Sequence, residues 1–141
     1  MSTSSFPVSR KRLRQSAGNA IVESALCFLL CMTIFMGIME FSMGVFTYNF
    51  VSYAAREGAR YAATHGSLSG SPATSNSIQT LIRNQAVALD PSLLAVSTTW
   101  NPNNTPGNTV AVKVSYPITP LIGFALGNIT VGATSTMAIA Q

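Results

Sequence analysis

The most prominent pattern in the chain is a long run of apolar positions near the N-terminus. Residues 21–45 are mostly Leu, Ile, Met, Phe, Ala, Cys and Gly, and Glu23 and Glu40 are the only charged residues between Arg14 and Arg56. A helix needs about 20 mostly apolar residues, at about 1.5 Å of rise each, to cross a bilayer. The pattern therefore predicts a single transmembrane helix over about residues 21–45.

The predicted helix is longer than the apolar run itself, because no proline interrupts the sequence from about Asn19 to Ala63. A helix over residues 19–63 would be roughly 68 Å long, against roughly 30 Å for the hydrocarbon core of a bilayer. Its second half is therefore expected to project beyond the membrane and to pack on other parts of the protein.

The projecting end of this helix carries two different faces. One face is polar and aromatic at helical spacing and consists of Tyr53, Arg56, Glu57, Arg60 and Tyr61. The opposite face has only small residues, Ala55, Gly58, Ala59 and Ala62. Glycine in a helix interior costs about 1 kcal/mol relative to alanine, so Gly58 indicates that another backbone packs closely there. Both faces are predicted to be packing or partner surfaces, with high helix propensity as the alternative reason for the alanines.

A connector and a second helix are predicted next. Residues 64–77 are small and polar with Gly and Pro, which is typical of a linker. Asn76 and Gln79 resemble a capping box, and Pro91 is expected to end the helix. The apolar stripe of this helix consists of Ile78, Leu81, Ile82, Ala86 and Leu89.

After Pro91 the apolar period changes from that of a helix to that of a strand. Alternation predicts strands over residues 94–100, 110–116 and 129–139, with a hairpin loop between the first two. The predicted fold class is α+β: a long N-terminal transmembrane helix, and a small outer domain over residues 78–141 with one short helix and a three-stranded antiparallel sheet. The hydrophobic core of this domain is too small to be stable alone, so we expect the alanine face of the long helix to complete it.

Charge is scarce and unevenly distributed. Only 9% of residues are charged, against roughly 25% in soluble domains, which argues against an ordinary cytosolic enzyme. Four of the eight basic residues precede the first acidic residue: Arg10, Lys11, Arg12 and Arg14. Such a cluster is also seen in nucleic-acid-binding tails, but the adjoining apolar run favours a membrane and no nucleic acid. Basic residues before a span hold the N-terminus in the cytoplasm, so residues 1–18 are interpreted as a disordered cytoplasmic leader and the C-terminal domain as periplasmic.

Residues that often carry chemistry do not form a recognisable catalytic motif. Cys27 and Cys31 share one face of the span and are interpreted as small apolar residues, with crosslinks between subunits as the alternative; two cysteines alone do not make a zinc site. His65 is expected on the surface, and a Ser-His-Asp triad would require it to lie near Asp90. We therefore expect no catalytic, cofactor or metal site, and a protein that is not an enzyme.

The start of the apolar run has the pattern of a prepilin leader. The basic leader is followed by Gly18-Asn19-Ala20-Ile21-Val22-Glu23, and the span ends in Ile38-Met39-Glu40-Phe41 before Ala54-Ala55-Arg56-Glu57-Gly58-Ala59-Arg60. Over about residues 16–64 the chain resembles the TadE-like family, the minor pilins or pseudopilins of the Tad (Flp) pilus. A conventional secretory signal peptide is the other reading of such a start, but this apolar run is too long for it.

The resemblance implies that prepilin peptidase cuts after Gly18 on the cytoplasmic side, which makes Asn19 the first residue of the mature chain. It also implies that Glu23, at mature position five, pairs with the terminal amine of a neighbouring subunit during assembly. The alternative for Glu23 is that it is simply an acid at the cytoplasmic interface of the membrane. For Glu40, we favour the interpretation that it is an acid at the opposite membrane interface. Ser24 stands where family members usually have an aromatic residue.

The resemblance further implies a pilin-like fold and a structural function. The expected partners are the inner membrane, prepilin peptidase, the major pilin, other pseudopilins and the assembly platform of a pilus used in tight adherence or secretion, and the protein itself can end in the extracellular filament. A membrane-tethered periplasmic binding or adhesion module is the alternative. Loss of residues 1–18 distinguishes the two, because a simple tether has no reason to be cut.

Overall fold

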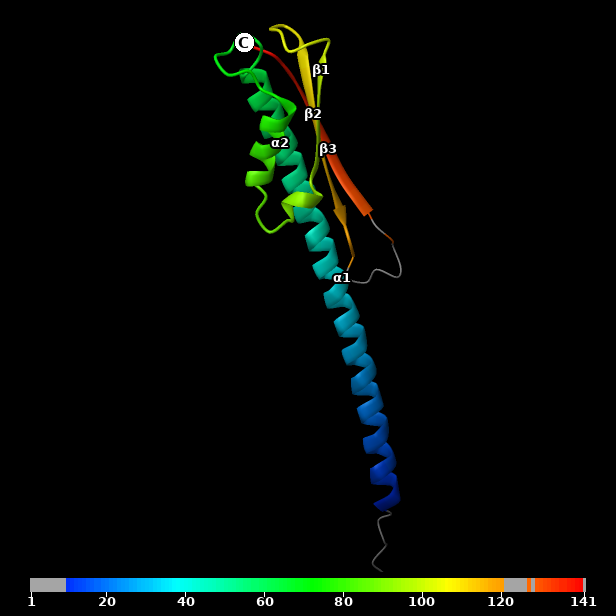
Figure 1. Cartoon of the computed structure of the whole chain (residues 1–141). Coiled ribbons are helices and arrows are strands. Elements are labelled where there is room, and N and C mark those ends of the chain that lie inside the picture. Colours follow the sequence, from blue (N-terminus) through cyan, green and yellow to red (C-terminus); the bar gives the residue numbers. More distant parts are fainter. Residues whose placement is uncertain (1–9, 121–126, 128, 141) are drawn as a thin grey trace, which may run out of the picture. The chain divides into compact units, whose positions relative to one another are not determined.

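The computed structural model describes residues 10–120, 127 and 129–140, with side chains from Gly18 onward (Figure 1). The chain divides into two compact units, Met1–Met39 and Glu40–Gln141. Helix α1, Arg10–Thr64, contributes its first part to one unit and its last part to the other.

The first unit, where it is described, consists of α1. The helix begins at Arg10 and not near Asn19, so the expectation of a disordered leader is wrong for residues 10–18. Arg, Lys, Leu, Gln and Ala all have high helix propensity, and they fill most of the sequence from Arg10 to Ala17. The same expectation for residues 1–9 lies outside the described residues.

Apolar side chains of α1 are exposed along the first unit. Ile21, Leu29 and Phe35 are 70%, 69% and 55% exposed. Within the described part of the chain this is the one helix that is long and apolar enough to cross a membrane. The prediction of a candidate span near the N-terminus is therefore confirmed, and the helix is compatible with membrane anchoring.

The second unit is an α+β domain, as the alternating pattern predicts. It contains the end of α1, helix α2 (Ser75–Asn84), the short 3-10 helix η1 (Pro91–Leu93) and three strands, β1 (Ala95–Asn101), β2 (Thr109–Ile118) and β3 (Ile129–Ala138). The strands form one antiparallel sheet in the order β1-β2-β3. Figure 1 shows the end of α1 running along the sheet with α2 beside it.

The core lies between one face of this sheet and the two helices. Alternate valines of β2 point into it, because successive side chains of a strand point to opposite faces, and Val110, Val112 and Val114 are fully buried. Helix α2 contributes Ile78 and Ile82, which are also fully buried. Helix α1 contributes smaller side chains, and these are Val51, Ala54, Ala55, Ala59, Ala62 and Ala63.

Helix α2 is shorter than its apolar stripe predicts, and its cap differs. Thr74 and not Asn76 is the N-cap: the backbone N–H of Ser77 donates to Thr74 Oγ1 (3.1 Å), and the backbone N–H of Thr74 donates to Ser77 Oγ (2.9 Å). A cap residue needs extended backbone before the first turn, and Thr74 has it, with φ −113° and ψ 159°. The prediction of a capping box at Asn76 and Gln79 is therefore wrong.

The end of α2 also differs from the prediction, since the helix stops at Asn84 and not near Pro91. Ala88 has a φ of +63°, in the left-handed region that interrupts a right-handed helix. Leu89 still reaches the core with 9% exposure, although it does so from a loop. The apolar stripe thus predicted the buried Ile78, Ile82 and Leu89, whereas Leu81 and Ala86 are half-buried, and it did not predict that Leu89 lies in a loop.

Candidate functional site: the polar and small faces of α1

The small face of α1 is an internal packing surface of the second unit. A Cβ atom built on Gly58 would lie 2.9 Å from Ile82 Cδ1, 3.1 Å from Val112 Cγ1 and 3.3 Å from Ile78 Cγ2. Real Cβ atoms are not found at the shortest of these distances, so only glycine fits here without movement of the neighbours. Ala55, Ala59 and Ala62 on the same face are at most 1% exposed. The face occupies the place where α1 meets both α2 and β2.

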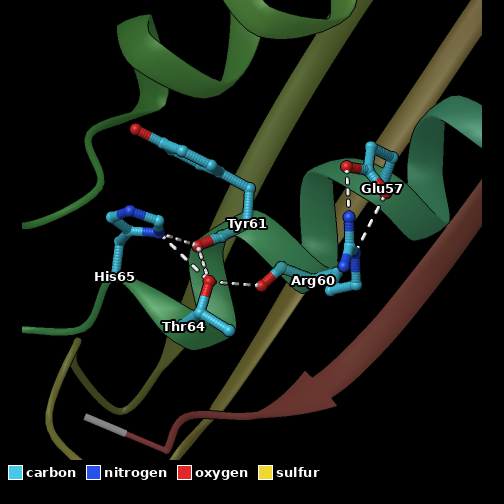
Figure 2. Close-up of polar contacts among 5 residues, drawn as sticks. All are labelled: Glu57, Arg60, Tyr61, Thr64 and His65. Carbon is cyan, nitrogen blue, oxygen red and sulfur yellow. Dashed lines mark hydrogen bonds and ion pairs between the residues drawn. The ribbon is translucent and has the colours of Figure 1, made fainter.

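The polar face contains one ion pair, shown in Figure 2. Arg60 donates from Nη2 to Glu57 Oε1 (2.8 Å) and from Nε to Glu57 Oε2 (3.1 Å), a bidentate arrangement between residues three apart. The hydrogen bonds from Arg60 lower the pKa of Glu57 and, in return, raise the pKa of Arg60. Both groups therefore stay charged at neutral pH, and each neutralises the other on the helix surface.

Arg56 differs from Arg60, although the two belong to the same sequence segment. Its side chain is exposed, and within the described residues no carboxylate pairs with it. It lines a groove of about 250 Å³ together with Tyr48, Ser52 and residues 132–135 of β3. The sequence predicted Arg56 as part of a partner surface, but it gave no signal that β3, far along the chain, forms the other wall.

The C-terminal end of α1 explains the position of the single histidine. His65 Nδ1 lies 2.9 Å from the Tyr61 carbonyl oxygen and 3.1 Å from Thr64 Oγ1, and the rings of His65 and Tyr61 stack with centroids 4.2 Å apart (Figure 2). The last carbonyl groups of a helix lack hydrogen-bond partners within the helix, and the side chains of His65 and Thr64 supply such partners here. His65 is half-buried and completes the end of the helix.

The start of the apolar run places its polar residues along one side of α1. Asn19, Glu23 and Cys27 follow one another at four-residue spacing, which puts them on one helix face, and they line a shallow depression with Val22 and Leu26. Ser24 donates its hydroxyl hydrogen to the Ala20 carbonyl oxygen (2.8 Å), so the hydroxyl is satisfied within the helix. Glu23 itself is exposed.

Glu40 lies where the second unit begins and is half-buried there. It lines a cavity of about 310 Å³ with Met43, Leu93, Ile118 and other residues of that unit. Nearby, Thr47 is 2% exposed and donates its hydroxyl hydrogen to the Met43 carbonyl oxygen (2.8 Å). Glu40 thus borders the folded domain, a position that the hydropathy pattern alone did not indicate.

Chemistry-bearing side chains are dispersed in the described part of the chain. No group of three or more His, Cys, Asp and Glu residues there is placed to hold a metal ion. Cys27 and Cys31 are free and exposed on α1. The features that the structure does bring together are the packed small face, the Glu57–Arg60 pair and the groove beside Arg56.

A family comparison identifies the segment in which most of these residues lie. The family model described as TadE-like protein matches residues 18–60. Residues 18–60 are therefore similar to this family, and we call them the TadE-like segment. The resemblance expected from the sequence is confirmed over this range. No curated protein matches the chain, and no solved structure matches it.

The TadE-like segment begins at Gly18 and ends at Arg60. It therefore includes the predicted span over residues 21–45, the small face up to Ala59 and the Glu57–Arg60 pair. The sheet, α2 and the His65 cluster lie outside it. The groove beside Arg56 has one wall in the TadE-like segment and the other in β3.

Proposed function

We propose that this protein is a pseudopilin or minor pilin, anchored in the inner membrane, that takes part in the assembly of a Tad (Flp) pilus. The observation that carries the proposal is the TadE-like segment, because it coincides with the candidate membrane span and with the packed end of α1. A TadE-like segment suggests a protein associated with the Tad pilus. The role is structural: the helix anchors and registers the subunit, and the α+β domain presents surfaces to other subunits.

Processing by prepilin peptidase after Gly18 is the first part of this proposal. Gly18 is exposed, and a Cβ atom placed there would meet no atom within 4 Å. Glycine weakens a helix by about 1 kcal/mol relative to alanine, so the backbone at Gly18 opens more easily than its neighbours. An exposed and easily opened peptide bond suits a protease. The mature chain would then begin at Asn19.

Glu23 is proposed to act in the assembly of subunits. A charged carboxylate within a bilayer costs about 2.5–3.5 kcal/mol on insertion scales and therefore usually has a partner or a function. Cleavage after Gly18 would create an ammonium group at Asn19, one helical turn from Glu23. Between neighbouring subunits, such opposite charges would attract, reduce the cost of both groups in lipid and set the axial register of the helices.

The proposed location follows from charge and hydropathy. Arg10 to Arg14 would remain on the cytoplasmic side, and the second unit would lie in the periplasm. Its expected partners are prepilin peptidase, the major pilin, other pseudopilins and the assembly platform.

Intact-mass measurement of the membrane-extracted protein tests the proposal. In cells with an active prepilin peptidase, we expect the mass of a chain that begins at Asn19. Substitution of Gly18 by a bulky residue should restore the full-length mass, while Gly37→Leu, further along the same helix, should leave processing unchanged. A full-length mass for the wild-type chain would contradict the pseudopilin assignment and favour a tethered periplasmic binding or adhesion module.

A further inference from the structure

Strand β3 is an open edge of the sheet. Among the described residues, the strand order β1-β2-β3 gives β3 a neighbour on one side only. Its ten residues, Ile129–Ala138, include no charged residue and no proline. Natural proteins usually protect edge strands with charges, prolines, bulges or covering elements, since the free N–H and C=O groups pair readily with another strand. This edge lacks the protection that its side chains could give.

The helices also cover β3 less completely than they cover the centre of the sheet. The inward-facing valines of β2, Val110, Val112 and Val114, are fully buried. The corresponding residues of β3 are only half-buried, and these are Val131, Ala133, Ser135 and Met137. The inner face of β3 is therefore partly open on the side that α1 overlooks.

The groove beside Arg56 lies between this open part of β3 and helix α1. Tyr48, Ser52 and Arg56 are four residues apart, so they form one row along the helix, and residues 132–135 form the opposite wall. The walls offer hydroxyl groups, backbone and one guanidinium group. This lining suits a polar, extended ligand better than the apolar face of a helix, which needs a row of apolar pockets.

Arg56 is the charged group that gives the groove selectivity. Among the described residues no carboxylate pairs with it, whereas Arg60, four residues later, is held by Glu57 at 2.8 Å. A guanidinium group binds a carboxylate through two parallel hydrogen bonds, and such charge-assisted bonds are the strong ones. Arg56 is therefore available for a carboxylate supplied from outside the domain.

We propose that the groove binds an extended peptide segment of another protein chain, which adds a strand along β3 and places a carboxylate on Arg56. The backbone bonds of the added strand would supply affinity, and the Arg56 contact would select an acidic residue at one position. The inference rests on the proposed assembly role only for the source of the segment, which would be another pilus subunit. The binding itself requires no pilus.

Binding of a synthetic peptide to the purified full-length protein in detergent micelles tests this proposal. The probe is a capped, fluorescently labelled peptide of alternating Thr and Val with one central Glu, and its anisotropy reports binding. We expect the Glu peptide to bind about tenfold more tightly than the same peptide with Gln, given the strength of charge-assisted hydrogen bonds. A Glu peptide with N-methyl groups on all of its backbone amides should not bind, because it lacks the backbone donors of a strand.

Variants of the protein identify the groove as the site. Arg56→Gln should reduce affinity for the Glu peptide to that for the Gln peptide and leave the Gln peptide unaffected, as a double-mutant cycle requires for a direct contact. Arg60→Gln removes the same charge one turn away and should leave both affinities unchanged. Arg56 is exposed, so its replacement is not expected to disturb the core.

Three results would overturn the inference: no binding of the Glu peptide at millimolar concentration, equal binding of the Glu and Gln peptides, or equal effects of the two arginine substitutions. None of them bears on processing after Gly18, which the intact mass reports. A failure of this inference is thus distinguishable from a failure of the proposed pilin role.

Discussion

Gly58 of α1 lies so close to Ile82 of α2 that a Cβ atom on Gly58 would be 2.9 Å from Ile82 Cδ1. The contact joins the TadE-like segment to the α+β domain, because Ile82 belongs to a helix outside that segment. Val112 of the central strand is also close to this position, and its Cγ1 would be 3.1 Å from the added Cβ. The absence of a side chain at Gly58 therefore sets how closely the helix approaches the rest of its domain.

Gly58→Leu should destabilise the domain by about 1–3 kcal/mol, the usual cost of overpacking a core. Gly58→Ala should have a smaller effect, since the gain of about 1 kcal/mol in helix propensity opposes the close contact with the flexible end of Ile82. Urea unfolding of the full-length protein in detergent, followed by Trp100 fluorescence, measures both. Gly37→Leu is the matched control, because a Cβ atom there meets no atom within 4 Å. Equal stability of Gly58→Leu and Gly37→Leu would contradict the close-packing account.

The N-cap of α2 gives a second prediction, which separates the observed cap from the one expected from sequence. Thr74→Ala should cost about 1 kcal/mol, since it leaves the Ser77 N–H without its acceptor. Asn76→Ala should change stability little, because Asn76 is exposed in the first turn and does not cap the helix. The same unfolding assay compares the two variants. A larger loss for Asn76→Ala would show that the helix begins elsewhere.

The sequence predicted the strands well because their signal is local. Val110, Val112 and Val114 alternate with less buried residues, and each buried valine can be recognised without knowing its partner. The end of α2 was missed because the apolar stripe continues past Asn84 to Leu89, which is buried although it lies in a loop.

The candidate site could be predicted only in part, for a related reason. Arg56, Glu57 and Gly58 are adjacent in sequence, yet they meet different surroundings: an open groove, an ion pair and a packed core. Helical spacing assigned them to faces, but it did not show what each face contacts. The wall of the groove formed by β3 depends on long-range pairing of strands, which no local pattern encodes.

The Glu57–Arg60 pair should make a small contribution to stability that depends on pH. The hydrogen bonds from Arg60 hold the pKa of Glu57 below its usual value of 4.5. A carboxylate with a lowered pKa in the folded state stabilises that state above its unfolded pKa, and this stabilisation is lost as pH falls through the folded pKa. The wild-type protein should therefore be more stable than Glu57→Gln at pH 7, and the difference should disappear well below pH 4.5.

Unfolding midpoints of both proteins between neutral and acidic pH measure this difference. In an Arg60→Gln background, the change at Glu57 should have little effect at any pH, which makes the double variant the control for the pair. The lowered pKa of Asp90, held by hydrogen bonds from Ser92, affects all of these proteins equally and cancels in the comparison. A difference that persists unchanged at acidic pH would show that Glu57 acts through packing and not through its charge.

Topology provides a further prediction. A reporter enzyme that is active only in the periplasm, fused after Gln141, should be active, since the basic residues from Arg10 to Arg14 hold the other end in the cytoplasm. The matched fusion is to a reporter active only in the cytoplasm, which should be silent. The reverse pattern, with the protein stably inserted, would reverse the proposed orientation.

The last prediction concerns Glu23, whose proposed role lies between subunits. Glu23→Gln keeps the shape of the side chain and removes its charge, so insertion and cleavage after Gly18 should continue, while attraction to the Asn19 ammonium group of a neighbour should be lost. We expect a wild-type intact mass together with reduced co-purification of other pilus subunits after crosslinking in cells. Glu40→Gln is the control, because Glu40 borders the folded domain and follows Asn19 by 21 residues in the sequence. If Glu23→Gln co-purified these subunits as well as the wild type does, Glu23 would be an acid at the membrane interface with no part in assembly.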